Sequence, residues 1–344
     1  MEISIKNDFD FFSVFPSDEA CIQYLEHKRW NGKPKCPSCG NSKDNWFITT
    51  RKVYKCSDCR KQFSVIQGTI FQSSKIGLRS WFYSIFLLTT YPGYPSTRLA
   101  KRIGVQQRTA WLMLQKIRET MRDENSKKVL SGIVECDEAY LGSKPRRDLR
   151  LQKRMTEYKR DNDREYEHLK AAFGIIDRYS SQIVIRKFGW NRNCLTTDIA
   201  LHLLKKHVTT ISTVNTDEHP SYFRIPQHFH SHHVIRKNRF VNRTRKNGTT
   251  YKTRVTSYVD GKTHVNGIEN VWKHLQDMEK AVYKQFSYKH AQRYFDEFSF
   301  RWNRRTASFG NLLVEVIDNA LDKVITYGEL AKWNNEVQTN AWLN

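Results

Sequence analysis

Two stretches in the first half of the chain carry the spacing of apolar residues that is typical of helices. Residues 78–90 (LRSWFYSIFLLTT) are apolar almost throughout, and the YPGYP segment that follows contains the prolines and glycine that end a helix. Residues 96–121 place apolar side chains three and four positions apart on both sides of Gly104. This second stretch therefore predicts a helix, a tight turn and another helix.

Beyond residue 130 the period of the apolar positions changes to two, which predicts strands. Residues 131–143 read as a first strand, 171–190 as a hairpin and 211–222 as a shorter strand. Amphipathic helices are predicted at 194–208, before the shorter strand, and at 264–282, well after it. The RNase H-like fold has this order of elements: a strand, a hairpin, a helix, a strand and a later helix. We therefore predict an α/β domain of that class.

Four of the seven cysteines form two CxxC pairs, CPSC and CSDC, which are separated by 16 residues. Two such pairs match the spacing of a tetrahedral four-thiolate zinc site, whose ligands come from two short turns. Aromatic residues and the strand-like stretches NWFITT and KVYKCS surround them, as in a zinc ribbon. Two disulfides or a redox motif are the alternative, but the chain opens with no secretory signal. We predict one structural Zn²⁺, with the ligands Cys36, Cys39, Cys56 and Cys59.

The chain is strongly basic. Its 344 residues contain 58 Lys and Arg against 35 Asp and Glu, a net charge of +23, and the 13% aromatic content favours folded domains over a disordered tail. The longest apolar runs, such as 81–88, are far shorter than the roughly 20 residues of a membrane span. This composition disfavours an integral membrane protein, a secreted disulfide scaffold and a protein for acidic ligands. It favours a polyanionic partner, above all nucleic acid.

Two segments are candidates for contact with DNA. In the helix–turn–helix segment, residues at the start of the second helix usually reach base edges, although an ordinary helical hairpin is the alternative. Its candidate residues are Arg102, Gln106, Gln107 and Arg108. The stretch 219–259 contains no Asp or Glu, which favours a loop that contacts phosphates over a merely solvated surface. Its candidate residues are Arg236, Lys237, Arg239, Arg243, Arg245 and Lys246. A further basic tract occupies residues 144–160.

Three acidic residues stand where the predicted fold would bring them together: Asp137 in the first strand, Asp217 at the end of the fourth and Glu269 in the later helix. Their mutual repulsion calls for cations, and Mg²⁺ accepts carboxylate ligands while it leaves room for water and phosphate. A pair of such ions can activate an attacking oxygen and stabilise a leaving oxygen at phosphorus. Strand alternation predicts that Glu138 points to the opposite face, so we exclude Glu138 from the site. Each acid alone has a simpler interpretation, as a turn or solvated helix residue, and only the order of all three favours a site.

Several stretches together resemble the Merlin/ISXO-like group of insertion-sequence DDE transposases, which carry an N-terminal zinc ribbon. In order, they are SDEACIQYLEHKRWNGKPKCPSCGN, YKCSDCRKQFSVIQGTIFQSSKIGLRSWF, TRLAKRIGVQQRTAWLMLQKIR, VECDEAYLGSK, NTDEHPSY, HVNGIENVWKHL and YFDEFSFRWNRR, and they span about residues 14–305. The resemblance implies a transposase that cuts DNA at the terminal inverted repeats of its element and joins the released ends to a target. It places the metal acids on Asp137, Asp217 and Glu269.

The later helix departs from the family pattern in one respect. Many members carry Lys seven residues after the helix acid, whereas Gln276 stands here, and Lys273 is a candidate substitute one turn nearer to Glu269. Some relatives have Asn as the third site residue, so Asn266 competes with Glu269, although an amide offers a metal no charge. The candidates to orient a nucleophile or a phosphate are His219 and His264.

We therefore predict a zinc-ribbon domain with an N-terminal extension (1–74), a helix-turn-helix DNA-binding domain (75–128), an RNase H-like DDE domain (129–310) and a C-terminal helical tail (311–344). The predicted function is that of a transposase that binds terminal inverted repeats and catalyses strand cleavage and transfer with two Mg²⁺ or Mn²⁺ ions. A non-catalytic DNA-binding regulator, an inactive transposase remnant and a hydrolytic nuclease are the alternatives. Double-stranded DNA and further copies of the chain are the expected partners, without a membrane. The expected location is the cytoplasm, at the nucleoid of a prokaryotic source.

Overall fold

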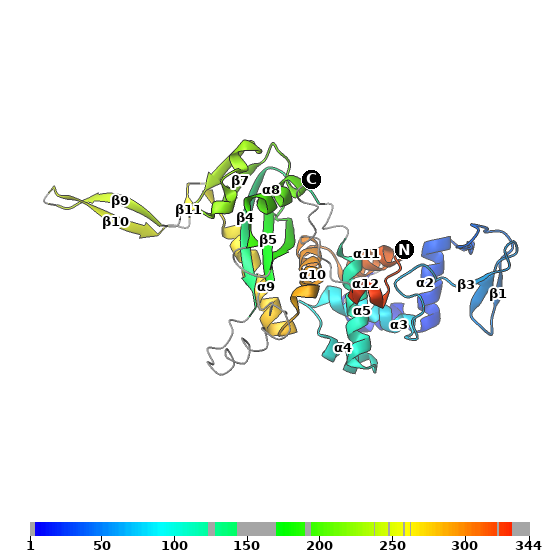
Figure 1. Cartoon of the computed structure of the whole chain (residues 1–344). Coiled ribbons are helices and arrows are strands. Elements are labelled where there is room, and N and C mark those ends of the chain that lie inside the picture. Colours follow the sequence, from blue (N-terminus) through cyan, green and yellow to red (C-terminus); the bar gives the residue numbers. More distant parts are fainter. Residues whose placement is uncertain are drawn as a thin grey trace, which may run out of the picture. The chain divides into compact units, whose positions relative to one another are not determined.

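The chain folds into two compact units (Figure 1). The computed structural model describes residues 4–122, 128–142, 170–189, 194–236, 238–246, 248–256, 259–261, 263–321 and 323–331. The first unit takes its described residues from 1–123 and 304–333, and the second takes them from 124–303. The predicted domains are contiguous segments, whereas the first unit is assembled from two separate parts of the chain.

The N-terminal part of the first unit is a small three-stranded antiparallel sheet preceded by two helices. The helices are α1 (Asp8–Val14) and α2 (Asp18–Trp30), and the strands are β1 (Trp46–Ile48), β2 (Val53–Lys55) and β3 (Gln62–Phe63). The side chains of Asn7 and Ser17 cap the two helices by accepting hydrogen bonds from backbone N–H groups of the first turn. Trp30, Tyr54 and Phe63 pack around the cysteines, so the predicted ribbon strands are confirmed.

Helices form the rest of the first unit. They are α3 (Leu78–Thr90), α4 (Ser96–Ile103), α5 (Gln107–Thr120), α11 (Phe309–Ala320) and α12 (Tyr327–Ala331). Gly104 ends α4 at φ 70°, a left-handed conformation that glycine adopts without strain. The predicted helix, turn and second helix are therefore confirmed as elements. Helix α11 packs against α3 and α5, so part of the predicted tail completes the core of this unit.

The second unit is built on a five-stranded mixed sheet with the order β6-β5-β4-β7-β8. Its strands are β4 (Ile133–Leu141), β5 (Lys170–Asp177), β6 (Ile183–Gly189), β7 (Thr213–Thr216) and β8 (Ser231–Val234). Strands β4, β5 and β6 are antiparallel neighbours, whereas β7 and β8 run parallel to β4. The prediction of a mixed α/β domain is confirmed, and β8 is a strand that the sequence pattern had not predicted.

Helices cover both faces of this sheet (Figure 1). One face packs against α8 (Thr197–His207) and the short 3₁₀ helix η2 (Pro220–Tyr222). The other packs against α9 (Asn266–Asp277), which continues as the π-helical turn η4 (Met278–Tyr283), and against α10 (Ala291–Asn303). A Cβ atom at Gly174 of β5 would lie 2.4 Å from the ring of Trp272, so this glycine allows α9 to approach the sheet closely.

Shorter elements complete the second unit. Two 3₁₀ turns, η3 (Ile225–Gln227) and η5 (Tyr288–His290), accompany a hairpin of β9 (Asn238–Thr244) and β10 (Thr250–Thr256) and a pair of two-residue strands, β11 (Val259–Asp260) and β12 (Thr263–His264). Among the helices of the described ranges, none combines the length and apolar character that a membrane crossing requires.

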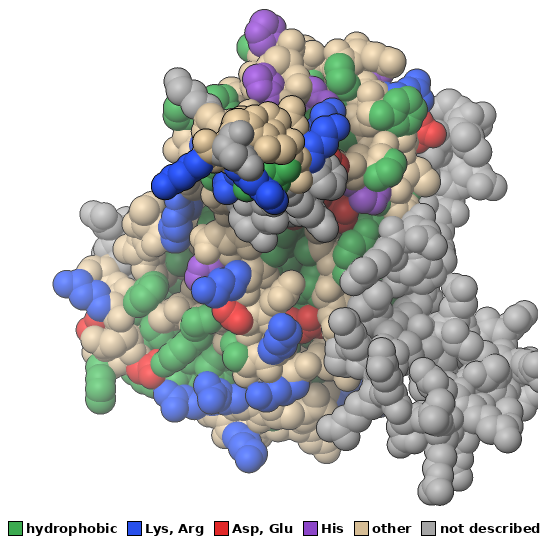
Figure 2. Space-filling view, turned by 90° about the vertical axis from the view of Figure 1, so that its left-hand side faces the viewer, with side chains coloured by type: hydrophobic (Ala, Val, Ile, Leu, Met, Phe, Trp, Pro, Cys, Tyr) green, Lys and Arg blue, Asp and Glu red, His purple; other side chains and the backbone are tan. Residues whose placement is uncertain are grey.

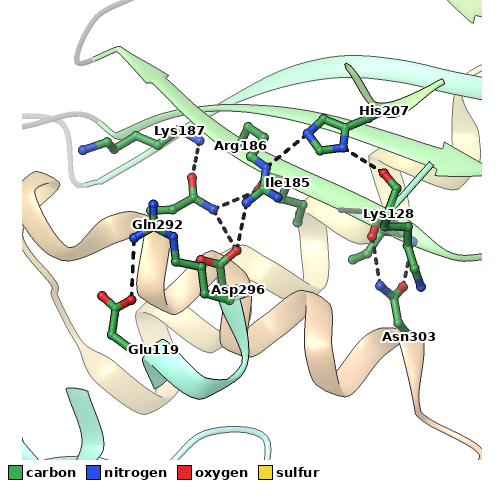
Figure 3. A network of polar contacts seen from close by, with 11 residues as sticks. Glu119, Lys128, Ile185, Arg186, Lys187, His207, Gln292, Asp296 and Asn303 are labelled. Carbon is green, nitrogen blue, oxygen red and sulfur yellow. Dashed lines mark hydrogen bonds and ion pairs between the residues drawn. The ribbon is translucent and has the colours of Figure 1, made fainter. Parts of the chain in front are cut away.

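A polar network joins α8, the edge strand β6 and α10 inside the second unit (Figure 3). Arg186 pairs with Asp296 at 3.1 Å, and its Nε donates to His207 Nε2 at 3.4 Å. The Nδ1 atom of His207 lies 2.9 Å from the carbonyl oxygen of Lys128. Burial lowers the pKa of His207 from 6.5 to about 4, and Arg186 adds to this effect. His207 is therefore neutral in the folded chain, with its proton on Nδ1.

Acidification should weaken the second unit through His207. Between pH 6.5 and about 4 the unfolded chain binds a proton at this residue that the folded chain does not, so its contribution to stability is complete above pH 6.5 and is lost as the pH falls through that window. The shift corresponds to roughly 3 kcal/mol. In urea unfolding, the free energy of unfolding of the His207→Gln variant should depend less on pH than that of the unchanged chain. Replacing the exposed His230 by Gln should leave the pH dependence as it is in the unchanged chain. Parallel pH profiles for all three proteins would contradict this assignment.

Candidate active site

The register between β4 and β7 brings two of the predicted acids to the same level of the sheet. Glu135 is opposite Asn215 in this parallel pair, so Asp217, two residues further along, comes level with Asp137. Strand β7 ends at Thr216, whereas β4 continues to Leu141. The edge of β4 is therefore no longer paired with β7 from this point on, and Asp217 lies beside it.

Three carboxyl groups meet at this edge. Ligand oxygens of Asp137, Glu138 and Asp217 all lie within 4.8 Å of one another. Strand alternation holds, because Trp272 Nε1 of α9 donates to Asp137 Oδ2 at 3.0 Å and Tyr222 Oη, on the other face, donates to Glu138 Oε2 at 2.6 Å. Nevertheless, the prediction that alternation removes Glu138 from the cluster is wrong. Where the neighbouring strand ends, side chains from both faces can reach around the edge towards Asp217.

The cluster concentrates negative charge, and its nearest basic neighbour among the described residues is His219. Burial, together with the charges of Glu138 and Asp217, raises the pKa of Asp137 to about 8. Burial also raises the pKa of Glu138, although Tyr222 and His219 oppose the shift. Within the described residues, no Lys or Arg pairs with any of the three acids. Three clustered carboxylates without a Lys or Arg partner could hold a hard divalent cation.

His219 lies beside this cluster, as the sequence predicted from its position. Its backbone N–H donates to Asp217 Oδ1 at 3.1 Å, and its Nε2 is 3.8 Å from Glu138 Oε1. The Nδ1 atom accepts a hydrogen bond from the N–H of Ser221, which caps η2. The Pro220 turn therefore places the His219 ring against Glu138.

A different buried acid, Glu135, anchors the start of α9. Its carboxylate accepts a hydrogen bond from the backbone N–H of Ile268 at 3.1 Å and pairs with Arg178 at 2.9 Å. A Cβ atom at position 267 would lie 2.8 Å from Glu135 Oε2, so Gly267 makes room for this contact. His264 Nδ1 is 3.1 Å from the same carboxylate. The sequence pattern did not predict this anchor, although an acid two residues before Asp137 in a strand with buried neighbours was a usable signal.

The predicted residues of α9 differ in their exposure. Glu269 lies half-buried in the first turn of the helix, and it is not among the three mutually close acids found in the described part of the chain. Asn266, the first residue of α9, is exposed, as is Lys273. Gln276 is half-buried one turn after Trp272.

The four predicted zinc ligands form a separate cluster in the ribbon. Their sulfur atoms all lie within 4.8 Å of one another, with Sγ–Sγ distances of 3.6 Å for Cys36 and Cys59 and 3.5 Å for Cys39 and Cys56. A residue with positive φ follows each pair, Gly40 at 76° and Arg60 at 61°, so the backbone folds back around the sulfur atoms. Burial opposes ionisation of Cys56, but the N–H groups of Cys59 and Asp58 lower its pKa to about 6. Four converging thiols in two tight turns fit a structural Zn²⁺.

Of the four DNA-binding residues predicted in the helix–turn–helix segment, three contact other side chains of the first unit. Arg102 pairs with Asp8 at 2.9 Å and donates to Tyr83 Oη at 2.8 Å. Gln107 donates to Ser96 Oγ at 2.9 Å, and the guanidinium of Arg108 lies 5.9 Å from the ring centre of Tyr327. Gln106 is exposed at the start of α5.

The basic stretch forms the β9–β10 hairpin. Arg236, Arg243, Arg245 and Lys246 are exposed, and the guanidinium of Arg245 lies 5.0 Å from the ring centre of Tyr251. Arg239 is opposite Val255 in the hairpin register, while its side chain, Lys237 and the tract 144–160 lie outside the described residues. Figure 2 shows a face on which Lys and Arg side chains gather, with a few acidic and histidine side chains among them.

Comparisons with known proteins agree with both clusters. A family profile described as ISXO2-like transposase domain matches residues 129–303, and one described as transposase zinc-ribbon domain matches residues 16–62. A Halobacterium salinarum protein named "Uncharacterized protein in transposable element ISH50" is 28% identical over 132 residues. That alignment covers 37% of this chain and 43% of the relative, so it spans less than half of that protein. The acid cluster lies in the first matched region and the cysteine cluster in the second, and the chain belongs to the ISXO2-like transposase family.

Proposed function

We propose that this chain is a transposase that binds the terminal inverted repeats of an insertion sequence and catalyses metal-dependent strand cleavage and strand transfer. The observation that carries the proposal is the cluster of three carboxylates without a Lys or Arg partner among the described residues. It lies within the region that matches the ISXO2-like transposase domain. The order of the five strands, three antiparallel and two parallel, supports an RNase H-like domain.

In this proposal Asp137, Asp217 and Glu269 hold two Mg²⁺ ions. When bound, such ions activate the attacking oxygen and stabilise the leaving oxygen during displacement at phosphorus. The protein's own contribution is to orient the ligands: Trp272 Nε1 holds one oxygen of Asp137, and the His219 N–H holds one oxygen of Asp217. Glu135, paired with Arg178 and His264, anchors the helix that carries Glu269. Asn266 and Lys273 remain candidates for support from the same helix.

DNA recognition is assigned to the helix–turn–helix segment, the zinc ribbon and the basic hairpin. Gln106, at the exposed start of α5, is in the position from which recognition helices contact bases. The exposed Arg243, Arg245 and Lys246 of the hairpin supply phosphate contacts. Double-stranded DNA is the partner, and a homo-oligomer is expected because two element ends are processed together.

Strand cleavage and joining of labelled element-end DNA by the zinc-loaded chain test the proposal, with Mg²⁺, with Mn²⁺ or with neither, and with Asp217→Asn beside the unchanged chain. A joined product that requires the metal and disappears in the variant supports a transposase. Metal-dependent cleavage without joining would instead indicate a nuclease. Tight DNA binding with neither activity would favour a regulator or an inactive remnant.

Removing hairpin charges should reduce the salt dependence of DNA binding. Each phosphate contact contributes roughly 0.9 to the slope of log affinity against log salt concentration, so replacing Arg245 and Lys246 by alanine should lower the slope by about 1–2. The matched control removes two exposed charges from α8, Lys205 and Lys206. Fluorescence anisotropy titrations over a range of salt concentrations measure both slopes. Equal slopes in the two double variants would exclude the hairpin from the interface.

A further inference from the structure

We propose that Glu138 is a further oxygen ligand of the cation site at the β4 edge, held in place by Tyr222. This inference rests on the proposed function, because it assigns a further ligand to the same metal centre. The geometric basis is that an oxygen of Glu138 lies within 4.8 Å of ligand oxygens of both Asp137 and Asp217.

Tyr222 orients the Glu138 carboxylate. Its side chain is buried, with 1% of its surface exposed, and its ring packs 6.3 Å from the ring centre of Phe173. The hydroxyl donates to Glu138 Oε2 at 2.6 Å, a short bond of the kind that ionised acceptors form. The other oxygen, Oε1, faces the His219 ring at 3.8 Å. A buried donor that holds one oxygen of an acid while the other stays near neighbouring acids is typical of the groups that orient metal ligands.

Other buried acids of the second unit have a different environment. Glu135 pairs with Arg178, Glu279 with Lys170, Asp296 with Arg186 and Glu297 with Arg301. A buried carboxylate is costly unless such a partner neutralises it. Glu138 lies only three residues from Glu135 on the same strand, yet within the described chain it has no Lys or Arg partner and faces two further acids. A structural acid would follow the pattern of Glu135, whereas a metal ligand has the environment of Glu138.

The arrangement makes β4 the source of two ligands from opposite faces of the sheet. Asp137 approaches the edge from the side of α9, and Glu138 approaches it from the side of η2. Together with Asp217 they provide three carboxylates without a contribution from α9. We therefore expect the cation to bind even when the acid of α9 is removed, and to bind more weakly when Glu138 is neutralised.

Binding of Mn²⁺ to the zinc-loaded full chain tests this inference independently of activity. Free Mn²⁺ is counted from its electron paramagnetic resonance signal, and Mn²⁺ prefers the oxygen ligands of this site to the occupied thiolate site. The Glu138→Gln variant should weaken Mn²⁺ binding by roughly 10–100-fold, and Tyr222→Phe should weaken it by about tenfold. Glu218→Gln is the matched control, because Glu218 is exposed next to Asp217 and is not one of the three clustered acids.

The Asp137→Asn and Asp217→Asn variants test whether the acid cluster binds a cation at all, separately from the role of Glu138. Weak Mn²⁺ binding in Glu138→Gln as well as in both Asp variants, with normal binding in Glu218→Gln, supports the inference. Normal binding in Glu138→Gln together with weak binding in the Asp variants would overturn the inference and leave the proposed function intact. Normal binding in every variant would overturn both. Thermal melting of the zinc-loaded chain without added Mg²⁺ or Mn²⁺ checks folding, and Glu138→Gln should melt no lower than the unchanged chain, because it removes repulsion from the cluster.

Discussion

The Asp137→Asn variant should lose strand cleavage and joining by at least about 10³-fold, because a metal-bound carboxylate supports several kcal/mol of charge stabilisation in the reaction. DNA binding should stay within about twofold, since many phosphate contacts share that affinity. Cleavage assays and anisotropy titrations with element-end DNA measure the two effects. A variant that retains cleavage at the level of Glu218→Gln would remove Asp137 from the site.

The same substitution should stabilise the fold when no Mg²⁺ is present. In the folded chain the pKa of Asp137 rises from 3.8 to about 8, through burial and the neighbouring charges of Glu138 and Asp217. The folded state therefore holds a proton that the unfolded state releases, and stability is lost as the pH rises through this window. At about pH 8.5, with zinc bound and no Mg²⁺ added, Asp137→Asn should be more stable than the unchanged chain by about 3 kcal/mol or more.

Added Mg²⁺ should reverse this order. The cation binds the ionised cluster of the unchanged chain and stabilises its folded state, whereas the variant lacks one of the ligand charges. Denaturant unfolding of both zinc-loaded proteins, without and with added Mg²⁺, measures the reversal. If Mg²⁺ shifts the two midpoints equally, the cluster does not bind the ion.

Loss of zinc should unfold the ribbon at residues 36–63 and leave the second unit folded. The ribbon strands contain three, three and two residues, and its core is built on Cys36, Cys56 and Phe63. So small a core cannot offset the entropy of ordering the segment, whereas zinc contributes about 10–16 kcal/mol in comparable sites. In Cys56→Ser, amide hydrogen exchange should lose protection in β1, β2 and β3 and keep it in β4 and β5.

Cys21 provides the control for this experiment. It is a buried cysteine of α2 in the same unit and is not one of the four clustered thiols. Cys21→Ala should keep one equivalent of zinc and the protection of the ribbon strands, at a cost of roughly 1–2 kcal/mol. A Cys56→Ser chain with full zinc content and unchanged protection would contradict the assignment of the ligands.

The sequence identified the elements that local patterns define. The strand patterns in residues 131–143 and 171–190 mark β4, β5 and β6, and the 78–90 run marks a buried helix. The CxxC pairs identified the zinc cluster because thiol spacing alone dictates how two tight turns can share a metal. The prediction that Asp137 and Asp217 lie close together is confirmed. It could be made from the sequence because parallel strands with a crossover helix place their corresponding ends at one level.

Tertiary structure decided the features that depend on where neighbouring elements end. Glu138 joins the acid cluster because the neighbouring strand β7 ends at Thr216. The alternation of side chains within β4 cannot predict where that neighbouring strand ends. Glu135 anchors α9 through Ile268, which lies 133 residues away in the sequence. In the same way α11 returns to α3 and α5, because its apolar face is buried there. Periodicity along a chain specifies which face of an element is buried, whereas the partner of that face is chosen by packing over long sequence separations.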